Sequence, residues 1–211
     1  DIGAEYGGIS ECQPDYVLPI EGVRPEFVTS PLVMYLNSTR LKVTDGESLG
    51  TVYDPYFNRS YRHFSSHQHA PNQPTPSGFD CGVAKGSILC FAHPVFSIYR
   101  MYGAVAYRHY ISNTIRRFLG DSLSLTTENM PSTARVHVAD QIKEQRYVAH
   151  LLWANTVLRG GSVELHGGTV RSTKPVEVVE DLVPLRNSRI SLRLPREVRR
   201  VTLEPQGMEI P

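Results

Sequence analysis

The apolar positions of residues 85–120 change their spacing at His93-Pro94. Residues 87–92 form a short apolar run, and a run of this kind that passes straight into a helix is typical of a sheet covered on both faces. Beyond it, apolar residues recur at steps of three and four, which predicts an amphipathic helix that ends at the last glycine of the stretch. Gly103 is a weak point of this pattern, and it can divide the helix into two shorter helices. The stretch therefore predicts an α/β unit.

Glycine and proline interrupt residues 1–31 so often that we expect loop there, with at most a short strand at residues 16–18. Strand formers return in residues 32–43 and 49–53, on either side of an Asp45-Gly46 turn pair. These two strands are placed to pair as a hairpin.

The apolar period changes to two after a polar connection that contains Pro131, and we expect a domain boundary there. Alternating apolar and polar positions predict a small antiparallel sheet or sandwich with one wet face. The predicted fold class is α/β plus all-β, with domains 1–122 and 123–211. The expected strands of the second domain are residues 134–139, 146–153, 176–183, 189–194 and 199–203, with an exposed excursion over residues 158–175.

Charge and composition exclude several classes of protein. The chain has 22 basic and 21 acidic residues and a formal net charge of +1, so nothing favours a nucleic-acid partner. No apolar run reaches the roughly 20 residues that a membrane span needs, so no membrane partner is expected. Cys12, Cys81 and Cys90 are too few for a disulfide framework and favour a reducing, cytoplasmic compartment, with a secreted or periplasmic location left open.

A loop rich in aromatic residues, arginine and histidine follows the second expected strand and leads into a proline-rich stretch. His63, His67 and His69 have spacings of four and two, which suit a shared metal ion. The alternative is that loop histidines bind backbone and shape a subunit contact. No carboxylate or cysteine lies beside them at ligand spacing, so we predict no metal and no cofactor. A stand-alone metal protein or hydrolase built on this loop stays as an alternative function.

Other catalytic patterns fit the chain poorly. Neither Cys81 nor Cys90 lies on the strand-to-helix elbow that a nucleophilic cysteine needs. Glu180 and Asp181 are neighbours in a β pattern and point to opposite faces, unlike the paired acids of a glycosidase. Trp153 ends the most apolar strand, which favours a core position over a sugar platform. A carbohydrate-binding module that uses the terminal β-domain stays as a further alternative function.

Six short segments, spread over most of the chain, share residues with one group of enzymes. They are Tyr56-Phe57-Asn58-Arg59, His63-Phe64-Ser65-Ser66-His67-Gln68-His69, Phe91-Ala92-His93-Pro94, Arg146-Tyr147-Val148-Ala149-His150-Leu151-Leu152, Glu180-Asp181-Leu182-Val183-Pro184-Leu185 and Leu203-Glu204-Pro205-Gln206-Gly207.

These segments resemble the trimerisation-domain region and C-terminal β-domain of glycoside hydrolases of the family 42 β-galactosidase type. The resemblance implies a partial flavodoxin-like, amidotransferase-like α/β domain followed by a small antiparallel β-sandwich. It also implies a catalytic (β/α)-barrel before Asp1, on the same or a separate chain, so that this chain carries no catalytic residue. Its role would be assembly of a homo-oligomer, a trimer.

The resemblance also implies a role for the loop. In trimers of this family a neighbouring subunit's loop helps to wall the sugar pocket, and aromatic rings and polar tips suit carbohydrate. The substrate-binding candidates are Arg59, His63, His67 and His69.

Overall fold

The computed structural model describes residues 1–159, 163–165, 169–172 and 176–210. The chain divides into two compact units, unit 1 (Asp1–Leu123) and unit 2 (Ser124–Pro211). No helix within the described residues is both long enough and apolar enough to cross a membrane.

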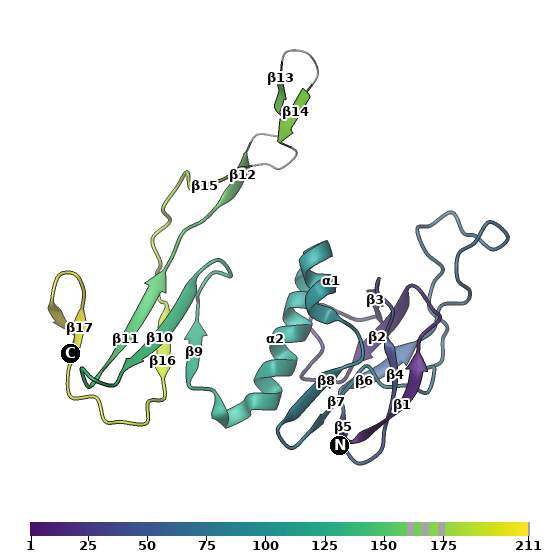
Figure 1. The fold of residues 1–211 in the computed structure, drawn as a ribbon, viewed down its shortest axis with the longest axis horizontal. Coiled ribbons are helices and arrows are strands. Elements are labelled where there is room, and N and C mark those ends of the chain that lie inside the picture. Colours follow the sequence, from purple (N-terminus) through teal and green to yellow (C-terminus); the bar gives the residue numbers. More distant parts are fainter. Residues whose placement is uncertain (160–162, 166–168, 173–175, 211) are drawn as a thin grey trace. The chain divides into compact units, whose positions relative to one another are not determined.

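Unit 1 is built from short antiparallel strands and two helices (Figure 1). β2 lies between β3 and β6 in one sheet, β7 lies between β5 and β8 in another, and β1 pairs with β4. The elements of unit 1 are β1 (Ala4–Ile9), β2 (Asp15–Pro19), β3 (Leu32–Met34), β4 (Thr39–Val43), β5 (Glu47–Ser48), β6 (Gly50–Tyr53), β7 (Gly82–Lys85), β8 (Ile88–Phe91), α1 (Val95–Tyr102), α2 (Val105–Leu119) and the 3₁₀-helix η1 (Gly120–Ser122).

The predicted helix is present, and it is divided where the sequence indicated. Gly103 ends α1 in the left-handed conformation, with φ of 63°, and its N–H donates to the Tyr99 carbonyl at 2.8 Å. Gly120 ends α2 with a positive φ of 46°. Both positions require a backbone conformation that glycine adopts without steric cost, which is why the apolar pattern is cut there.

The expected flavodoxin-like α/β arrangement is wrong. Every strand pairing within the described residues is antiparallel. β8 does pass into α1, but it forms a hairpin with β7 through a turn at Gly86, whose φ is 57°. A tight turn can join only antiparallel strands, and a four-residue apolar run carries no information about the direction of its neighbour.

Two expectations for the first third of unit 1 also fail. Residues 1–31 contain β1 in a segment expected to be loop, whereas β2 covers the short strand that was expected at residues 16–18. The strands on either side of the Asp45-Gly46 turn do not pair with each other: β4 pairs with β1, and β6 pairs with β2. Pairing between distant segments therefore decided the register, and the local turn signal did not.

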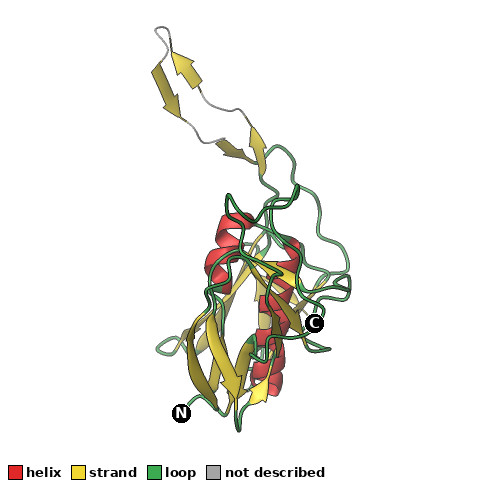
Figure 2. Ribbon diagram, turned by 90° about the vertical axis from the view of Figure 1, so that its right-hand side faces the viewer, coloured by secondary structure: helices red, strands yellow, loops and turns green. Residues whose placement is uncertain are grey.

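The helices cover the strands of unit 1 and close one apolar core (Figures 1 and 2). Val17 of β2 and Val52 of β6 pack in the same cluster as Ile98 of α1 and Tyr110 of α2. Because each helix turns one stripe of apolar residues inward, two short helices are enough to bury the sheet face.

A polar pair is buried within unit 1. The side chains of Asp15 and His93 are 0% and 1% exposed, and Oδ1 of Asp15 lies 2.5 Å from Nε2 of His93. The second carboxylate oxygen of Asp15 accepts a hydrogen bond from Ser38 at 2.8 Å. The carboxylate thereby joins β2 to the residue before β4 and to the residues that precede α1, and it satisfies groups that would be costly to bury alone.

Unit 2 differs from unit 1 because none of residues 124–159 and 177–210, whose burial the structure describes, is buried. The described strands form two-stranded antiparallel ladders, β9 with β16, β10 with β11, β12 with β15, β13 with β14 and β17 with β18, in place of the predicted sandwich. Part of the expected excursion at residues 158–175 lies outside the described residues. The strands of unit 2 are β9 (Leu125–Glu128), β10 (Arg135–Gln141), β11 (Arg146–Leu152), β12 (Val157–Arg159), β13 (Val163–Leu165), β14 (Thr169–Ser172), β15 (Val176–Val178), β16 (Arg189–Leu192), β17 (Val201–Leu203) and β18 (Met208–Ile210).

We expect Asp15→Ala to lower the free energy of unfolding of unit 1 by about 3 kcal/mol or more, because it leaves Ser38 and His93 buried without their acceptor. Hydrogen exchange of the β2 and β6 amides, read by mass spectrometry, measures this loss. The control is Lys85→Ala, which breaks exposed ion pairs to Asp1 and Asp45 and should leave exchange in β2 unchanged. Equal protection of β2 in both variants would contradict the structural role of Asp15.

Candidate functional site

The candidate site is the loop between β6 and β7, and its stem is held by backbone hydrogen bonds. The Ser77 N–H donates to the Val52 carbonyl at 2.8 Å, and the Gln73 N–H donates to the Asp54 carbonyl at 2.8 Å. Further out, the Tyr56 N–H donates to the Pro71 carbonyl at 3.0 Å. The two arms of the stem therefore run side by side like an irregular hairpin.

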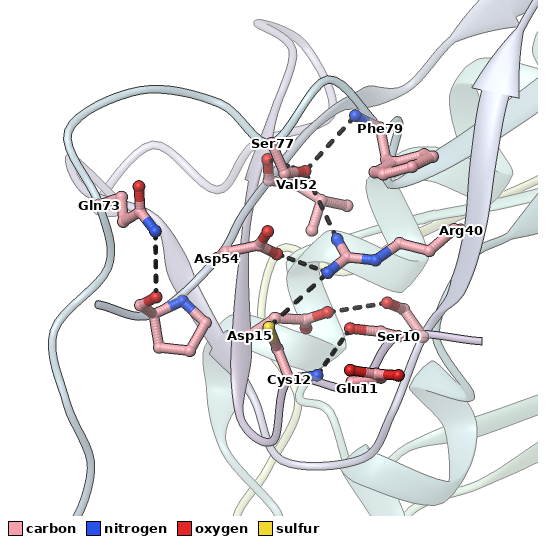
Figure 3. A network of polar contacts seen from close by, with 12 residues as sticks. Ser10, Glu11, Cys12, Asp15, Arg40, Val52, Asp54, Gln73, Ser77 and Phe79 are labelled. Atoms are coloured by element: carbon pink, nitrogen blue, oxygen red, sulfur yellow. Dashed lines mark hydrogen bonds and ion pairs between the residues drawn. The ribbon is translucent and has the colours of Figure 1, made fainter. Parts of the chain in front are cut away.

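Arg40 of β4 lies beneath this stem and holds both of its arms (Figure 3). Its guanidinium donates to Asp54 on the outgoing arm at 2.6 Å and contacts Ser77 on the returning arm at 3.5 Å. The same group lies over the Phe79 ring, 5.0 Å from its centre. The planar fork of arginine suits this use, since it binds several acceptors at fixed angles while its face packs on an aromatic ring.

A second anchor ties the loop to the turn between β1 and β2. The Asn58 side-chain amide donates to the Glu11 carbonyl at 2.8 Å, and its oxygen accepts the Gln13 N–H at 3.1 Å. Asn58 is the last loop residue held to another segment before the tip begins.

Two of the four predicted substrate-binding residues, Arg59 and His69, lie at the neck of the loop, where its two arms meet below the tip. Arg59 donates a hydrogen bond to the Gln68 carbonyl, which closes the neck. The ring of His69 packs between Tyr16 and Tyr35, with centroids 6.1 and 5.8 Å away. Both side chains therefore hold the loop in shape.

An aromatic cluster forms the base beneath His69. Tyr35 packs on Tyr102 of α1 with ring centres 4.5 Å apart, and the Tyr16 hydroxyl donates to the Ala70 carbonyl at 2.5 Å. Burial raises the pKa of Tyr16, so this hydroxyl keeps its proton at neutral pH and remains a donor. Nδ1 of His69 is buried without a hydrogen-bond partner in the described structure.

The other two predicted residues, His63 and His67, lie on the exposed tip. Beside them are two residues that were not among the candidates, Tyr61 at 83% exposure and Phe64 at 71%. The signal that would have found these rings is the placement of large aromatic residues in a polar loop whose anchors lie elsewhere. The tip therefore presents two rings and two imidazoles to solvent.

The loop histidines do not form a three-ligand metal centre. No group of three or more histidine, cysteine, aspartate or glutamate side chains in the described ranges is placed to hold a metal ion. His69 is packed among tyrosines at the base, whereas His63 and His67 are at the tip.

The cysteines are all free and differ in their surroundings. Cys81 is buried in the core beside the Tyr110 hydroxyl, and burial raises the pKa of its thiol to about 12. Cys12 contacts Arg40 at 3.7 Å, but burial and the nearby Asp54 carboxylate raise its pKa. Neither environment stabilises a thiolate.

A small cavity of about 190 Å³ lies between the β7–β8 turn and α2, away from the loop anchors. Its charged residues are already paired: Arg117 binds Glu47 at 2.5 Å, and Lys85 binds Asp45 at 2.7 Å. It therefore offers a ligand no unpaired charge.

Glu180 and Trp153 of unit 2, which were weighed as a catalytic acid and a sugar platform, each have a hydrogen-bond partner within the chain. Glu180 forms a two-point ion pair with Arg159, at 2.6 and 2.7 Å. Trp153 is partly exposed, and its indole N–H donates to the Val183 carbonyl at 2.5 Å. The expected core position of Trp153 is wrong because the described part of unit 2 has no buried core.

Comparison with known proteins shows that the chain is similar to part of a glycoside hydrolase. No family model and no curated protein matches it. Among solved structures it is similar to α-L-fucosidase isoenzyme 2 from Paenibacillus thiaminolyticus, with 33% sequence identity and a TM-score of 0.85. The match covers 100% of this chain and 30% of that chain, so the chain spans less than a third of the length of the enzyme it matches.

This likeness supports the expected relation to glycoside hydrolases at a coarse level. The matched enzyme is a fucosidase and not a β-galactosidase, so the likeness does not extend to family 42.

We expect Tyr16→Phe to loosen the loop, because it removes the hydroxyl that binds the Ala70 carbonyl. Loss of one buried hydrogen bond costs about 1 kcal/mol, which should speed trypsin cleavage after Arg59 and Arg62 several-fold. Tyr61→Phe is the matched control, since that ring is exposed. Equal cleavage rates in the two variants would show that the hydroxyl does not hold the base.

Alkylation should separate the thiols by burial. In the native chain at pH 8, iodoacetamide should leave Cys81 unmodified, and unfolding in urea should expose it. The rate at Cys12 should keep rising with pH beyond the range where an ordinary thiol levels off, because its pKa is raised. Peptide mass spectrometry assigns each site, and rapid labelling of Cys81 in the native state would contradict the structure.

Proposed function

We propose that this chain is a non-catalytic portion of a glycoside hydrolase that serves subunit association. The observation that carries the proposal is the likeness of the whole chain to 30% of a fucosidase chain. The two acids considered from the sequence, Glu180 and Asp181, lie on exposed segments of unit 2, and Glu180 is paired with Arg159. The chemistry is then assigned to a (β/α)-barrel elsewhere in the enzyme, on the same or a separate chain.

In this proposal the loop of residues 56–69 reaches the sugar pocket of a neighbouring subunit. Its stem is held by Arg40 and Asn58, whereas the rings of Tyr61 and Phe64 are exposed. Aromatic faces pack on the apolar faces of sugars, and imidazoles bind hydroxyl groups. A loop with a fixed stem and an exposed tip is suited to binding a group outside its own subunit.

The substrate in this proposal is an α-L-fucoside, by likeness to the matched enzyme, in preference to the β-galactoside that the sequence segments suggested. Assembly is cyclic, with the trimer as the expected state and with the loop or the α1–α2 region as the contact. The three free cysteines favour a reducing compartment.

Light scattering on a sizing column tests the assembly role. The isolated chain should elute as an oligomer and should not turn over aryl α-L-fucosides or aryl β-galactosides. A monomer that hydrolyses either substrate would overturn the proposal.

Subunit mixing tests the role of the loop. In the complete glycosidase, replacing both His63 and His67 with Ala should lower kcat/KM by about tenfold to a hundredfold, since substrate contacts are lost. Mixing these subunits with subunits whose barrel carboxylates are replaced should restore part of the activity, because a mixed oligomer contains one intact pocket. The control is Lys143→Ala in the β10–β11 turn. Full activity of the loop variant would show that the tip does not reach the pocket.

A further inference from the structure

Two histidines lie directly opposite each other in unit 2. His137 of β10 and His150 of β11 are partners in the antiparallel register. Their rings are stacked, with centroids 6.2 Å apart and an angle of 26° between the planes. Both residues are exposed.

The described residues provide no competing partner for the two rings. Among the described residues, neither imidazole takes part in a hydrogen bond or an ion pair that would occupy its nitrogens. On the same face of the ladder the next pairs are Arg135 with Leu152 and Ala139 with Val148, since side chains alternate along a strand. The ion pair of Arg196 with Asp140 involves a residue of the opposite face.

We propose that His137 and His150 form a two-histidine site for a divalent transition metal ion. Directly opposed residues of an antiparallel pair have their Cβ atoms about 5 Å apart, close enough for both imidazoles to reach one ion. The metal binds the neutral form of each imidazole. Water or a group from another molecule completes the coordination.

The ligand set determines which ion is preferred. Imidazole nitrogens suit copper, nickel and zinc, and for a given site the affinity rises from nickel to copper and falls again at zinc. No carboxylate lies on this face of the β10–β11 ladder, so magnesium and calcium should not bind. The site would also fasten the two strands together, in a unit that has no buried residue in its described part.

Calorimetric titration of the chain with Ni²⁺ at pH 7.5 tests the site. Because two ligands on a fixed frame bind cooperatively, His137→Gln and His150→Gln should each weaken the affinity by about tenfold or more. The double variant should be little weaker than either single variant, because one substitution already removes the second ligand. Electron paramagnetic resonance of the Cu²⁺ form should show two nitrogen ligands, and one in each single variant.

The matched control is the double variant His63→Gln with His67→Gln in the loop of unit 1, which should leave Ni²⁺ binding unchanged. Circular dichroism establishes that each variant keeps its strands. Binding that survives His137→Gln, or that is lost only in the loop variant, would overturn the proposal and assign the metal to other histidines.

Discussion

The buried carboxylate of Asp15 is the constraint on which the rest of unit 1 depends. It comes from β2, the central strand of its sheet, and it meets Ser38 and His93 from two distant segments. A buried charge or acceptor is tolerated only when its partners are in place, so these segments can take few other positions. The start of β4 and the start of α1 are therefore placed by one side chain.

The position of the loop follows from this constraint. Arg40 of β4 lies two residues after Ser38, and it holds Asp54 and Ser77 at the two ends of the loop stem. The polar contacts thus run from the core, through β4, to the residues that support the tip. Such a chain of contacts fixes the stem of a loop whose Tyr61 and Phe64 are exposed.

Unit 2 has a different basis for its structure. Two-stranded ladders are marginally stable in water by themselves, and its described residues bury no apolar side chain to reinforce them. Its side-chain contacts are cross-strand pairs and exposed ion pairs such as Arg159 with Glu180. Contacts of this kind are weak in solvent, so an ion held between opposed strands or a neighbouring surface would contribute a large share of its stability.

The sequence by itself determined the elements whose signals are local. The helix, its division at Gly103 and its end at Gly120 could be predicted, because backbone conformation and amphipathic spacing are properties of neighbouring residues. The loop, with His63 and His67, was also recognisable from composition alone.

Only the tertiary structure decided the pairing of strands and the roles of polar side chains. The direction of β8, the partners of β4 and β6, and the packing of His69 depend on segments far apart in the chain, for which periodicity carries no information. The same is true of Asp15 with His93 and of His137 with His150, since hydrogen bonding and stacking are set by distance in space.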